Sequence, residues 1–440
     1  MQIGMIGLGY VGLVTAVGFA ELGHNVYCHD IDESKLEMLS WRETPIYEEG
    51  LQEKLNDDSI FGNIHIERKI EPLLERSDMI FVAVGTPSSD DGSANTCYVE
   101  AVVRAIALGL CKVRKACEKI VVIKSTVPVG FTNKMNCLLQ NIIKDVPEIH
   151  VKFAFCPEFL REGTALNDFL NPERIVIGAE DEKTSAVVGE IYDRFRCKGV
   201  PFVYTNCASA EIVKYASNIM LAVRVAVINE VADYAEIAGG RIEDISKAVG
   251  LDSRIGNRYL KASLGFGGSC LPKDVKAFSY FTNESGLNLP VIQSIFRSNE
   301  AHITRQKERI CKVAQDYNLK NILVLGTAFK ADTDDIRESS SIKLVSQLVK
   351  YGLNVTVADP EALNNTKRIL ADSVSYTTDF YSVLGDTDML VICTDWEQFA
   401  KIDIVRAKQL MKGNIIFDLR NILSRSSAES YGFKYFGIAR

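Results

Sequence analysis

Short runs of hydrophobic residues alternate with longer helix-like stretches along most of the chain, a pattern typical of buried parallel strands joined by helices. Near the N-terminus, residues 2–6 predict a strand, the run up to Leu22 predicts a helix, and residues 25–28 predict a second strand. Gly23 supplies a helix stop between the helix and the second strand. The chain therefore begins with a strand, a helix and a strand, as α/β proteins do.

Three further hydrophobic runs, residues 79–84, 120–123 and 151–155, lead into segments rich in Ser, Thr and Pro. Thr86, Thr126 and Glu158 follow these runs in turn. Ser, Thr and Pro also end strands for purely structural reasons, so none of the three segments indicates a site by itself. Because the carboxyl ends of parallel strands meet at one edge of a sheet, where ligands bind, all three together favour a binding site.

A long, mostly apolar helix is predicted over residues 208–238, ending at Gly239 and Gly240. Its middle carries so few charges that we expect it to be buried, at a domain junction or in a dimer interface. Polar residues within it argue against a membrane span. Lys214 and Asn218 are four residues apart and share one face of the helix, where they could direct a cation and an amide at an oxyanion.

A second α/β sheet is predicted from hydrophobic runs at 321–325, 353–358, 389–393 and 414–417. Only Gly326 stands at the end of its first strand, so a second glycine-rich dinucleotide motif is missing. Lys330, Arg337 and Arg420 near its strand ends suggest contacts with phosphate or sugar instead.

The first strand runs into Gly7-x-Gly9-x-x-Gly12, and the second ends at Asp30, 18 residues after Gly12. This spacing of strand, glycines, helix, strand and acid predicts a dinucleotide site. The N-terminus of the helix would bind the pyrophosphate, and Asp30 would accept hydrogen bonds from the ribose hydroxyls. A carboxylate at that position repels a 2′-phosphate, so the expected cofactor is NAD rather than NADP.

Residues 264–274 combine Gly265, Gly267 and Gly268 with Cys270 and a following Pro-Lys-Asp. The glycines allow turns closed to other residues and close approach to a ligand. A helix beginning at the proline would direct its N-terminal dipole at Cys270, and Lys273 would add positive charge, both of which favour the thiolate. The segment therefore predicts a nucleophile; the alternative is a helix entry with a small buried cysteine.

Composition narrows the class of protein. The 440 residues are too many for one core. A net charge of −7 and a pI near 5.5 argue against nucleic acid as a partner. The 11 cysteines contain no Cys-x-x-Cys pair and the 5 histidines lie apart, so neither disulfides nor a metal site is expected. The N-terminus lacks the features of a signal peptide, so we expect a cytoplasmic protein.

Taken together, the motifs resemble those of the UDP-glucose/GDP-mannose dehydrogenase family. The resemblance covers nearly the whole chain, in segments 7–12, 45–48, 84–87, 125–128, 157–163, 265–274, 329–330 and 337–339. It implies two Rossmann-like doubly wound sheets joined by a long central helix. The expected domains are an NAD-binding domain (1–205), a central helical domain that also makes a homodimer (206–300), and a UDP-sugar-binding domain (301–440).

The family reaction oxidises C6 of a nucleotide sugar from an alcohol to an acid in two hydride transfers, using two NAD. A free aldehyde has no hydroxyl ready for a second hydride transfer, so a thiolate must add to it; the thiohemiacetal is then oxidised to a thioester that water cleaves. By resemblance Cys270 is this nucleophile and Lys214 and Asn218 stabilise oxyanions on C6. Asp274 and Thr126 would hold the water, and Glu158 would be the base in hydrolysis.

The resemblance also assigns the residues that bind ligands. Those expected to bind NAD are Gly7, Gly9, Tyr10, Val11, Gly12, Asp30, Lys35, Thr86, Thr126, Glu162, Lys273 and Arg337. Those expected to bind the sugar nucleotide are Glu158, Phe159, Leu160, Lys214, Asn218, Arg254, Tyr259, Lys261, Gly267, Phe329, Lys330 and Arg420, with Arg254 contributed across a dimer interface.

Three alternatives stay open. The first concerns the sugar nucleotide: residues 254–260 and 418–421 resemble the UDP-glucose branch of the family, but Leu271 after Cys270 is a form shared with GDP-mannose dehydrogenases. A GDP-mannose or UDP-N-acetylhexosamine dehydrogenase is therefore the close alternative. Leu419 stands where a glycine is frequent, which bears on the sugar contacts of Arg420. A β-hydroxyacid dehydrogenase would use one hydride transfer and no thiol. A sugar-nucleotide sensor would bind without turnover.

Overall fold

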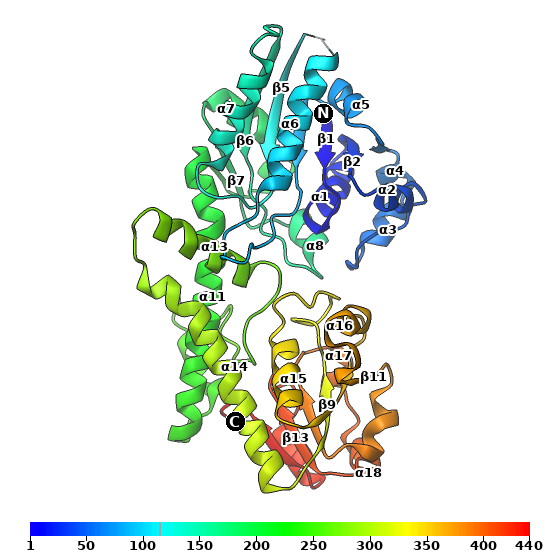
Figure 1. Cartoon of the computed structure of the whole chain (residues 1–440), viewed down its shortest axis with the longest axis vertical. Coiled ribbons are helices and arrows are strands. Elements are labelled where there is room, and N and C mark those ends of the chain that lie inside the picture. Colours follow the sequence, from blue (N-terminus) through cyan, green and yellow to red (C-terminus); the bar gives the residue numbers. More distant parts are fainter. Residues whose placement is uncertain (114–115) are drawn as a thin grey trace. The chain divides into compact units, whose positions relative to one another are not determined.

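The computed structural model describes residues 1–113 and 116–440 and divides into two compact units, Met1–Ser217 and Asn218–Arg440 (Figure 1). Each unit is built around one sheet with helices on both faces, so the α/β fold predicted from the sequence is confirmed. Helix α11 (Cys207–Ala238) contains the boundary between the units. A separate central domain over 206–300 stays a prediction.

The sheet of the first unit has eight strands in the order β3-β2-β1-β4-β5-β6-β7-β8. Its strands are β1 (Gln2–Ile6), β2 (Asn25–His29), β3 (Ile64–Ile66), β4 (Met79–Val82), β5 (Cys117–Ile123), β6 (Ile149–Phe155), β7 (Ile175–Ala179) and β8 (Phe202–Thr205). The five strands expected from hydrophobic runs are therefore present. Pairing is parallel except between β6 and β7, which are antiparallel, and no pattern in the sequence indicated β3, β7 or β8.

Helices cover both faces of this sheet. They are α1 (Tyr10–Glu21), α2 (Glu33–Ser40), α3 (Leu51–Asn56), α4 (Asp58–Phe61), α5 (Ile70–Arg76), α6 (Cys97–Val113), α7 (Phe131–Ile143), α8 (Ala165–Leu170), α9 (Glu182–Glu190) and α10 (Asp193–Cys197). Successive residues of β4 point to opposite faces: Met79 and Phe81 join the core that contains α1, and Ile80 and Val82 join the core that contains α6 and α7. Burial on both faces explains why the sequence of β4 is continuously hydrophobic.

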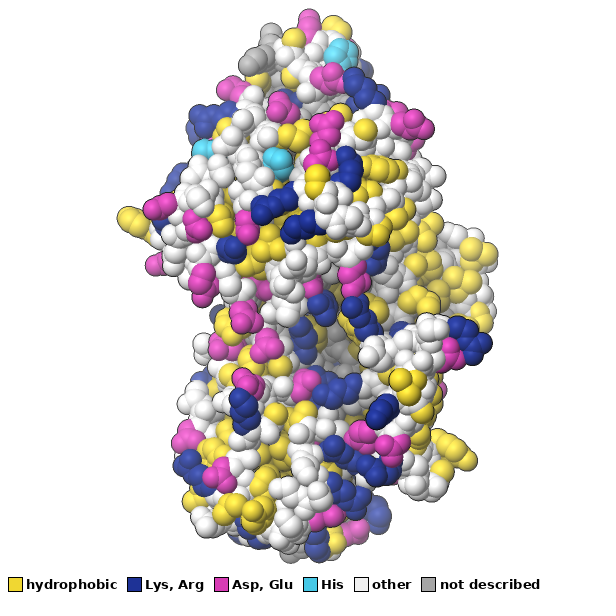
Figure 2. Space-filling view, turned by 180° about the vertical axis from the view of Figure 1, so that it is seen from behind, with side chains coloured by type: hydrophobic (Ala, Val, Ile, Leu, Met, Phe, Trp, Pro, Cys, Tyr) yellow, Lys and Arg dark blue, Asp and Glu magenta, His cyan; other side chains and the backbone are white. Residues whose placement is uncertain are grey.

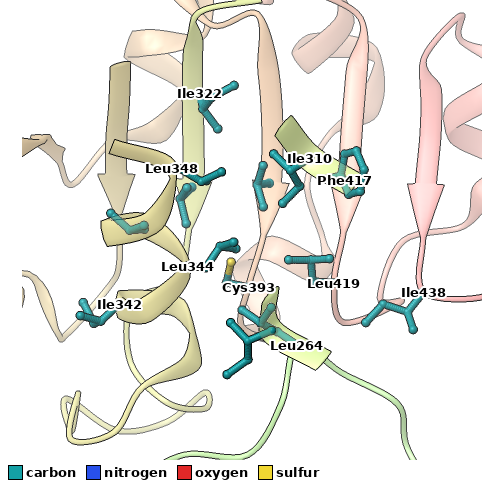
Figure 3. Packing of buried hydrophobic residues seen from close by; sticks show 14 of the residues in the cluster. Leu264, Ile310, Ile322, Ile342, Leu344, Leu348, Cys393, Phe417, Leu419 and Ile438 are labelled. Carbon is teal, nitrogen blue, oxygen red and sulfur yellow. The ribbon is translucent and has the colours of Figure 1, made fainter. Parts of the chain in front are cut away.

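The second unit repeats this arrangement with six parallel strands in the order β11-β10-β9-β12-β13-β14. They are β9 (Asn321–Leu325), β10 (Asn354–Ala358), β11 (Ser375–Thr377), β12 (Met389–Ile392), β13 (Ile415–Asp418) and β14 (Lys434–Gly437). Ile322 and Val324 of β9 face one core, part of which is drawn in Figure 3, while Leu323 and Leu325 face the other. The predicted second sheet is confirmed.

The helical elements that lie wholly within the second unit are α12 (Ile242–Gly250), α13 (Leu271–Glu284), α14 (Pro290–Asp316), α15 (Ser340–Lys350), α16 (Leu363–Leu370), η1 (Ala371–Ser373), η2 (Phe380–Asp386), α17 (Glu397–Ala400), α18 (Ile404–Leu410) and α19 (Arg425–Ser430). The two long helices α11 and α14 pack together in the core of this unit. Ile228 and Ala232 of α11 and Ile303 of α14 share one core. Met220, Val227 and Tyr234 of α11 are exposed, so this chain alone does not bury the helix on all sides.

The ends of β1 and β9 are built alike. Gly7 (φ +95°) and Gly326 (φ +96°) follow these strands in a conformation that side chains disfavour. The next N–H group in each case, that of Leu8 or of Thr327, donates to a carboxylate at the end of the neighbouring strand, Asp30 at 2.6 Å or Asp359 at 2.7 Å. The two sheets therefore share this local design, and the six strands of the second sheet follow the same order as the first six strands of the first sheet.

Candidate active site

The glycine motif places the N-terminus of α1 at the carboxyl end of β1. Gly9 is the N-cap, and no side chain caps the helix there. A Cβ atom added to Gly12 would lie 1.8 Å from the carbonyl oxygen of Gly7, so packing demands this glycine. A Cβ on Gly9 would have no described atom within 4 Å apart from those of the adjoining backbone. An uncapped helix start beside open space at Gly9 fits a bound pyrophosphate.

The acid expected at the ribose lies beside this turn. The Asp30 carboxylate accepts from the Leu8 N–H at 2.6 Å and from the Asp32 N–H at 2.9 Å, and the Lys35 ammonium is 3.7 Å away. The structure thus brings together Asp30 and Lys35, both expected to bind NAD. Tyr10, at the start of α1, donates its hydroxyl proton to the Tyr47 carbonyl at 2.9 Å.

The strand ends that follow β4 and β5 also converge. The Thr86 hydroxyl donates to the Thr126 carbonyl oxygen at 2.8 Å. Ser125, next to Thr126, donates to the Val84 carbonyl at 2.6 Å, which ties the two segments together again. The grouping of Thr86 and Thr126 at one sheet edge, expected from the sequence, is observed.

Glu158, after β6, forms a buried ion pair with Lys214 of α11. The Lys214 ammonium donates to the Glu158 carboxylate at 2.7 Å and to its carbonyl oxygen at 2.8 Å, and both side chains are less than a tenth exposed. Burial opposes ionisation of the carboxyl, but the charge and hydrogen bond of Lys214, the Leu160 N–H and the charge of Lys124 outweigh it and lower the pKa of Glu158. Glu158 is therefore held as a carboxylate.

The residues that follow Glu158 in this loop are also held in place, and the first of them, Phe159, lies against two cations. The ring of Phe159 has the Arg174 guanidinium 3.8 Å and the Lys214 ammonium 5.7 Å from its centroid. Leu160 donates its N–H to Glu158 at 2.6 Å, and one carboxylate oxygen of Glu162, later in the loop, is buried. Lys124, directly after β5, is a buried cation that is not among the predicted site residues, although it follows a predicted strand.

Glu48 holds the far end of this loop from more than a hundred residues away along the chain. Its buried carboxylate accepts from the N–H groups of Gly163 at 2.8 Å and Ala165 at 2.6 Å. Ala165 begins α8, so Glu48 caps this helix and fixes the loop that starts at Glu158. The motif at residues 45–48 thus has a structural role that its sequence did not reveal.

We expect Glu48→Gln to destabilise the first unit by about 1–2 kcal/mol, because both carboxylate oxygens of Glu48 accept hydrogen bonds and an amide offers only one acceptor. Such a loss lowers a thermal midpoint by about 2–8 °C, which differential scanning calorimetry measures. The matched control is Glu49→Gln at the exposed neighbour, where no change is expected. Equal midpoints for both variants would contradict this role of Glu48.

Cys270 stands at the N-terminus of α13 in the second unit. It is the N-cap residue, the helix begins at Leu271, and Pro272 occupies the second helical position rather than the first. The thiol is half-buried, whereas residues 262–268 before it are buried. A cysteine at a helix N-terminus with partial exposure is the environment in which thiolates form and react. The alternative, a helix entry with a small buried cysteine, shares this helix entry but differs in that Cys270 is half-buried rather than buried.

The groups expected around Cys270 are engaged with one carboxylate. Asp274 is almost fully buried, and it accepts from the Asn218 amide at 2.6 Å and from the Lys273 ammonium at 2.6 Å. The charge of Lys273 is therefore directed at Asp274. Asn218, one helical turn after Lys214 on α11, has its amide oriented by this contact.

The residues expected to bind the sugar nucleotide are partly brought together in the second unit. Lys261 and Arg420 bind opposite oxygens of Asp395 at 3.3 and 2.9 Å. Burial raises the pKa of Asp395, but the charges of Arg420 and Lys261 outweigh it, so the net pKa is lowered. Asp395 was missed, although it stands two residues after the predicted strand 389–393, as Thr86 and Thr126 stand after theirs.

The segment 329–338 packs on the glycines before Cys270. A Cβ on Gly268 would lie 2.8 Å from the ring of Phe329, and one on Gly267 would lie 2.5 Å from the Glu338 carbonyl oxygen. Lys330 follows Phe329 directly. The carbonyl of Arg337 accepts from the Gly268 N–H at 2.9 Å, while its guanidinium binds Asp335. Close packing against this segment therefore explains both glycines.

Two more predicted residues lie before this loop. The Arg254 side chain is 87% exposed and pairs with Asp252 at 2.6 Å, so among the residues that the structure describes its ion-pair partner is a neighbour in sequence rather than a predicted site residue. Tyr259 has a positive φ of +61°, which places it in the left-handed region.

The described residues contain no cluster of three or more His, Cys, Asp or Glu side chains arranged to hold a metal ion. Among these residues there is also no helix long and apolar enough to cross a membrane. Acidic and basic side chains are interspersed on the face drawn in Figure 2.

Comparison with models of known protein families identifies the family of this chain. Models of the UDP-glucose/GDP-mannose dehydrogenase family match the chain in order: its NAD binding domain over residues 1–196, its central domain over 208–301 and its UDP binding domain over 323–425. The chain belongs to this family. Residues 1–196 match the NAD binding domain of the family, so NAD is the cofactor of this chain.

Individual members of the family are similar over the full length. UDP-glucose 6-dehydrogenase TuaD of Bacillus subtilis (strain 168) is 37% identical over 441 residues, which cover 100% of this chain and 93% of that protein. A UDP-glucose dehydrogenase structure from the hyperthermophilic archaeon Pyrobaculum islandicum has a TM-score of 0.88 at 37% identity, covering 99% of this chain and 97% of that one. A UDP-D-ManNAc dehydrogenase from Pyrococcus horikoshii has a TM-score of 0.85 at 27% identity, covering 100% and 99%.

Proposed function

We propose that this protein oxidises the C6 alcohol of UDP-glucose to a carboxylate in two successive steps and so makes UDP-glucuronate. The observation that carries the proposal is the half-buried thiol of Cys270 at the N-terminus of α13, in a chain similar over its full length to UDP-glucose 6-dehydrogenases. When bound, NAD supplies the hydride acceptor. Two oxidations at one carbon require a nucleophile in between, and Cys270 is the residue whose surroundings suit it.

The protein's own groups have distinct tasks in this mechanism. The Cys270 thiolate adds to the C6 aldehyde and forms a carbon–sulfur bond, and the new oxyanion takes a proton; after oxidation, water adds to the thioester and the thiolate leaves. Lys214 and Asn218 stabilise the oxygen on C6 at each stage. Glu158 accepts a proton from the attacking water, which Asp274 and Thr126 orient. The contact of Lys214 with Glu158 and that of Asn218 with Asp274 support the roles of Lys214 and Asn218, because both donor side chains are already oriented.

We expect two NADH for each UDP-glucose consumed, with UDP-glucuronate as the product. Absorbance at the NADH band gives the amount of NADH formed, and mass spectrometry of the nucleotide sugar identifies the product in the same experiment. One NADH per product would favour the chemistry of a β-hydroxyacid dehydrogenase, and binding of UDP-glucose without turnover would favour a sensor. Either result would contradict the proposed two-step oxidation of the C6 alcohol.

The identity of the sugar is the finer question. Leu271 after Cys270 is the form shared with GDP-mannose dehydrogenases, and the P. horikoshii relative acts on a UDP-N-acetylhexosamine by its name. The alternative function is therefore 6-dehydrogenation of one of these nucleotides. Running the same assay with UDP-glucose, UDP-N-acetylmannosamine and GDP-mannose separates them, and activity on GDP-mannose alone would overturn the choice of UDP-glucose.

We also propose a cytoplasmic homodimer formed through α11. Met220 and Val227 are more than half exposed on this helix, and Tyr234 continues the same face two turns later. An apolar stripe left uncovered by its own chain is typical of an interface between subunits. In such a dimer Arg254, which is exposed here, would be contributed to the partner's site, as the family resemblance implies.

A further inference from the structure

The segment that leads to Cys270 is buried and anchored in the core of the second unit. Leu264 is 1% exposed and lies among Leu344, Cys393 and Leu419 (Figure 3). Its neighbours on both sides are also buried, so their backbone N–H and C=O groups are largely shielded from water. Buried backbone groups need partners from the protein, and here side chains provide them.

Asn299 of α14 pairs with both polar backbone groups of Phe266. Its amide oxygen accepts from the Phe266 N–H at 2.9 Å, and its amide nitrogen donates to the Phe266 carbonyl at 3.0 Å. Asn299 is only 2% exposed, so these bonds are shielded from water. The side chain thus acts as a neighbouring strand would. A Cβ on Gly265 (φ +143°) would lie 2.7 Å from the Asn299 oxygen, so this pairing also explains the glycine.

His302, one turn later on α14, holds the residue on the other side of Leu264. Its Nε2 atom lies 2.9 Å from the Ser263 carbonyl oxygen, and Nδ1 lies 3.0 Å from an Asp233 carboxylate oxygen. Both ring nitrogens thus lie within hydrogen-bonding distance of an oxygen atom, one on each side of the ring. Asn229 of α11 accepts from the Ser263 N–H at 2.9 Å. Side chains from two helices therefore fix the backbone on both sides of Leu264.

The same helix also supports the segment after Cys270, because α13 packs against α14. Between these two supports lie Gly267 and Gly268, which by themselves leave the backbone many conformations. We propose that Asn299, assisted by His302, is a positioning residue that sets where the Cys270 sulfur stands and thereby how fast it reacts. This inference rests on the proposed nucleophilic role of Cys270. A small displacement of a reacting atom is enough to cost on the order of a hundredfold in rate.

The test compares Asn299→Asp with Ser298→Ala. The first variant keeps the shape of residue 299 but places a carboxylate oxygen against the Phe266 carbonyl, so one hydrogen bond is lost. The second removes the neighbouring contact of α14 with Glu230 and leaves the loop untouched. In both, the rate of alkylation of Cys270 by iodoacetamide is followed by peptide mass spectrometry. The exposed Cys97, Cys137 and Cys197 serve as internal standards for the reagent.

We expect Asn299→Asp to change the alkylation rate of Cys270 at least about fivefold and to lower kcat by on the order of ten- to a hundredfold. Dissociation constants for NAD and UDP-glucose, and the alkylation of the three exposed cysteines, should stay within about twofold of the unmodified protein. Ser298→Ala should match the unmodified protein throughout. This split between kcat and binding would not arise from a general loss of structure.

Equal Cys270 alkylation in the two variants would overturn the proposal, as would a parallel loss of kcat and of both binding affinities. If Asn299→Asp does not fold, His302→Gln carries the same test, because glutamine keeps a donor for the Ser263 carbonyl but loses the contact with Asp233. Alkylation needs no turnover, so it reports on positioning even if UDP-glucose is not the substrate. A lack of two NADH per UDP-glucose in the unmodified protein would instead count against the proposed function.

Discussion

Cys270→Ser is expected to reduce production of the acid by on the order of a thousandfold or more, because serine has no thiolate to add to the C6 aldehyde. The substitution replaces one sulfur by oxygen at a half-buried position, so the fold should be retained. Binding of NAD and of UDP-glucose, measured by calorimetry, should therefore stay within about threefold of the unmodified protein. Acid formation is measured by mass spectrometry of the nucleotide sugar after incubation with NAD.

The matched control is Cys137→Ser, at an exposed cysteine of α7 in the other unit. It should leave acid formation unchanged. Undiminished acid formation by Cys270→Ser would refute the covalent route, whatever the family resemblance implies. Loss of nucleotide binding in the same variant would show that the residue acts through structure.

The second large effect is expected for Lys214→Ala. The Lys214–Glu158 ion pair is buried, so removal of the ammonium leaves an uncompensated carboxylate and costs about 3–5 kcal/mol in the free energy of unfolding. If Lys214 also stabilises the oxyanion on C6, kcat should fall by on the order of 10²–10³ in the protein that remains folded. Urea unfolding and turnover with UDP-glucose measure the two effects separately.

The pH dependence of this variant gives an independent check. In the unmodified protein the pKa of Glu158 is lowered, so its contribution to stability is present above the unfolded pKa of about 4.3 and is lost as the pH falls through the folded value. Without Lys214, burial acts in the opposite direction and raises the pKa. The stability difference between the two proteins should therefore be largest near pH 7 and shrink towards pH 4.

Lys183→Ala is the control for this experiment, because Lys183 pairs with Glu118 at 3.7 Å with both side chains well exposed. Exposed pairs contribute little, so its unfolding free energy should change by less than about 1 kcal/mol at every pH. A Lys214→Ala protein as stable as Lys183→Ala would contradict the role given to the buried pair.

Hydrophobic patterning predicted the parts of the fold that are buried on both sides. Strand β4 is apolar throughout, and β9 is apolar after its first residue, because helices cover both faces of their sheets. The peripheral strand β11 is only three residues long, and its residues are exposed or half-buried, so no apolar run marked it. The reversed direction of β7 depends on the path of its connections, which periodicity does not encode.

The sequence likewise predicted only part of the candidate site. Helical spacing showed that Lys214 and Asn218 share a face, because that is a property of neighbouring residues. It did not show that Glu158 and Asp274 would be their partners, since those contacts join residues 56 positions apart in both cases. Glu48 is the extreme example: its partners follow it by 115 and 117 positions. Long-range pairing is decided by packing and has no local signature.

The acids at the ends of β2 and β10, which accept from the turns after β1 and β9, differ in how many hydrogen bonds they accept. In the second half the Asp359 carboxylate accepts four N–H groups, from Thr327 and Ala328 on one side and Glu361 and Ala362 on the other. Four donors use up the lone pairs of a carboxylate. Grafting glycines next to Gly326 would therefore not create a second coenzyme pocket, because the acid that should receive a ribose is already saturated by its own main chain.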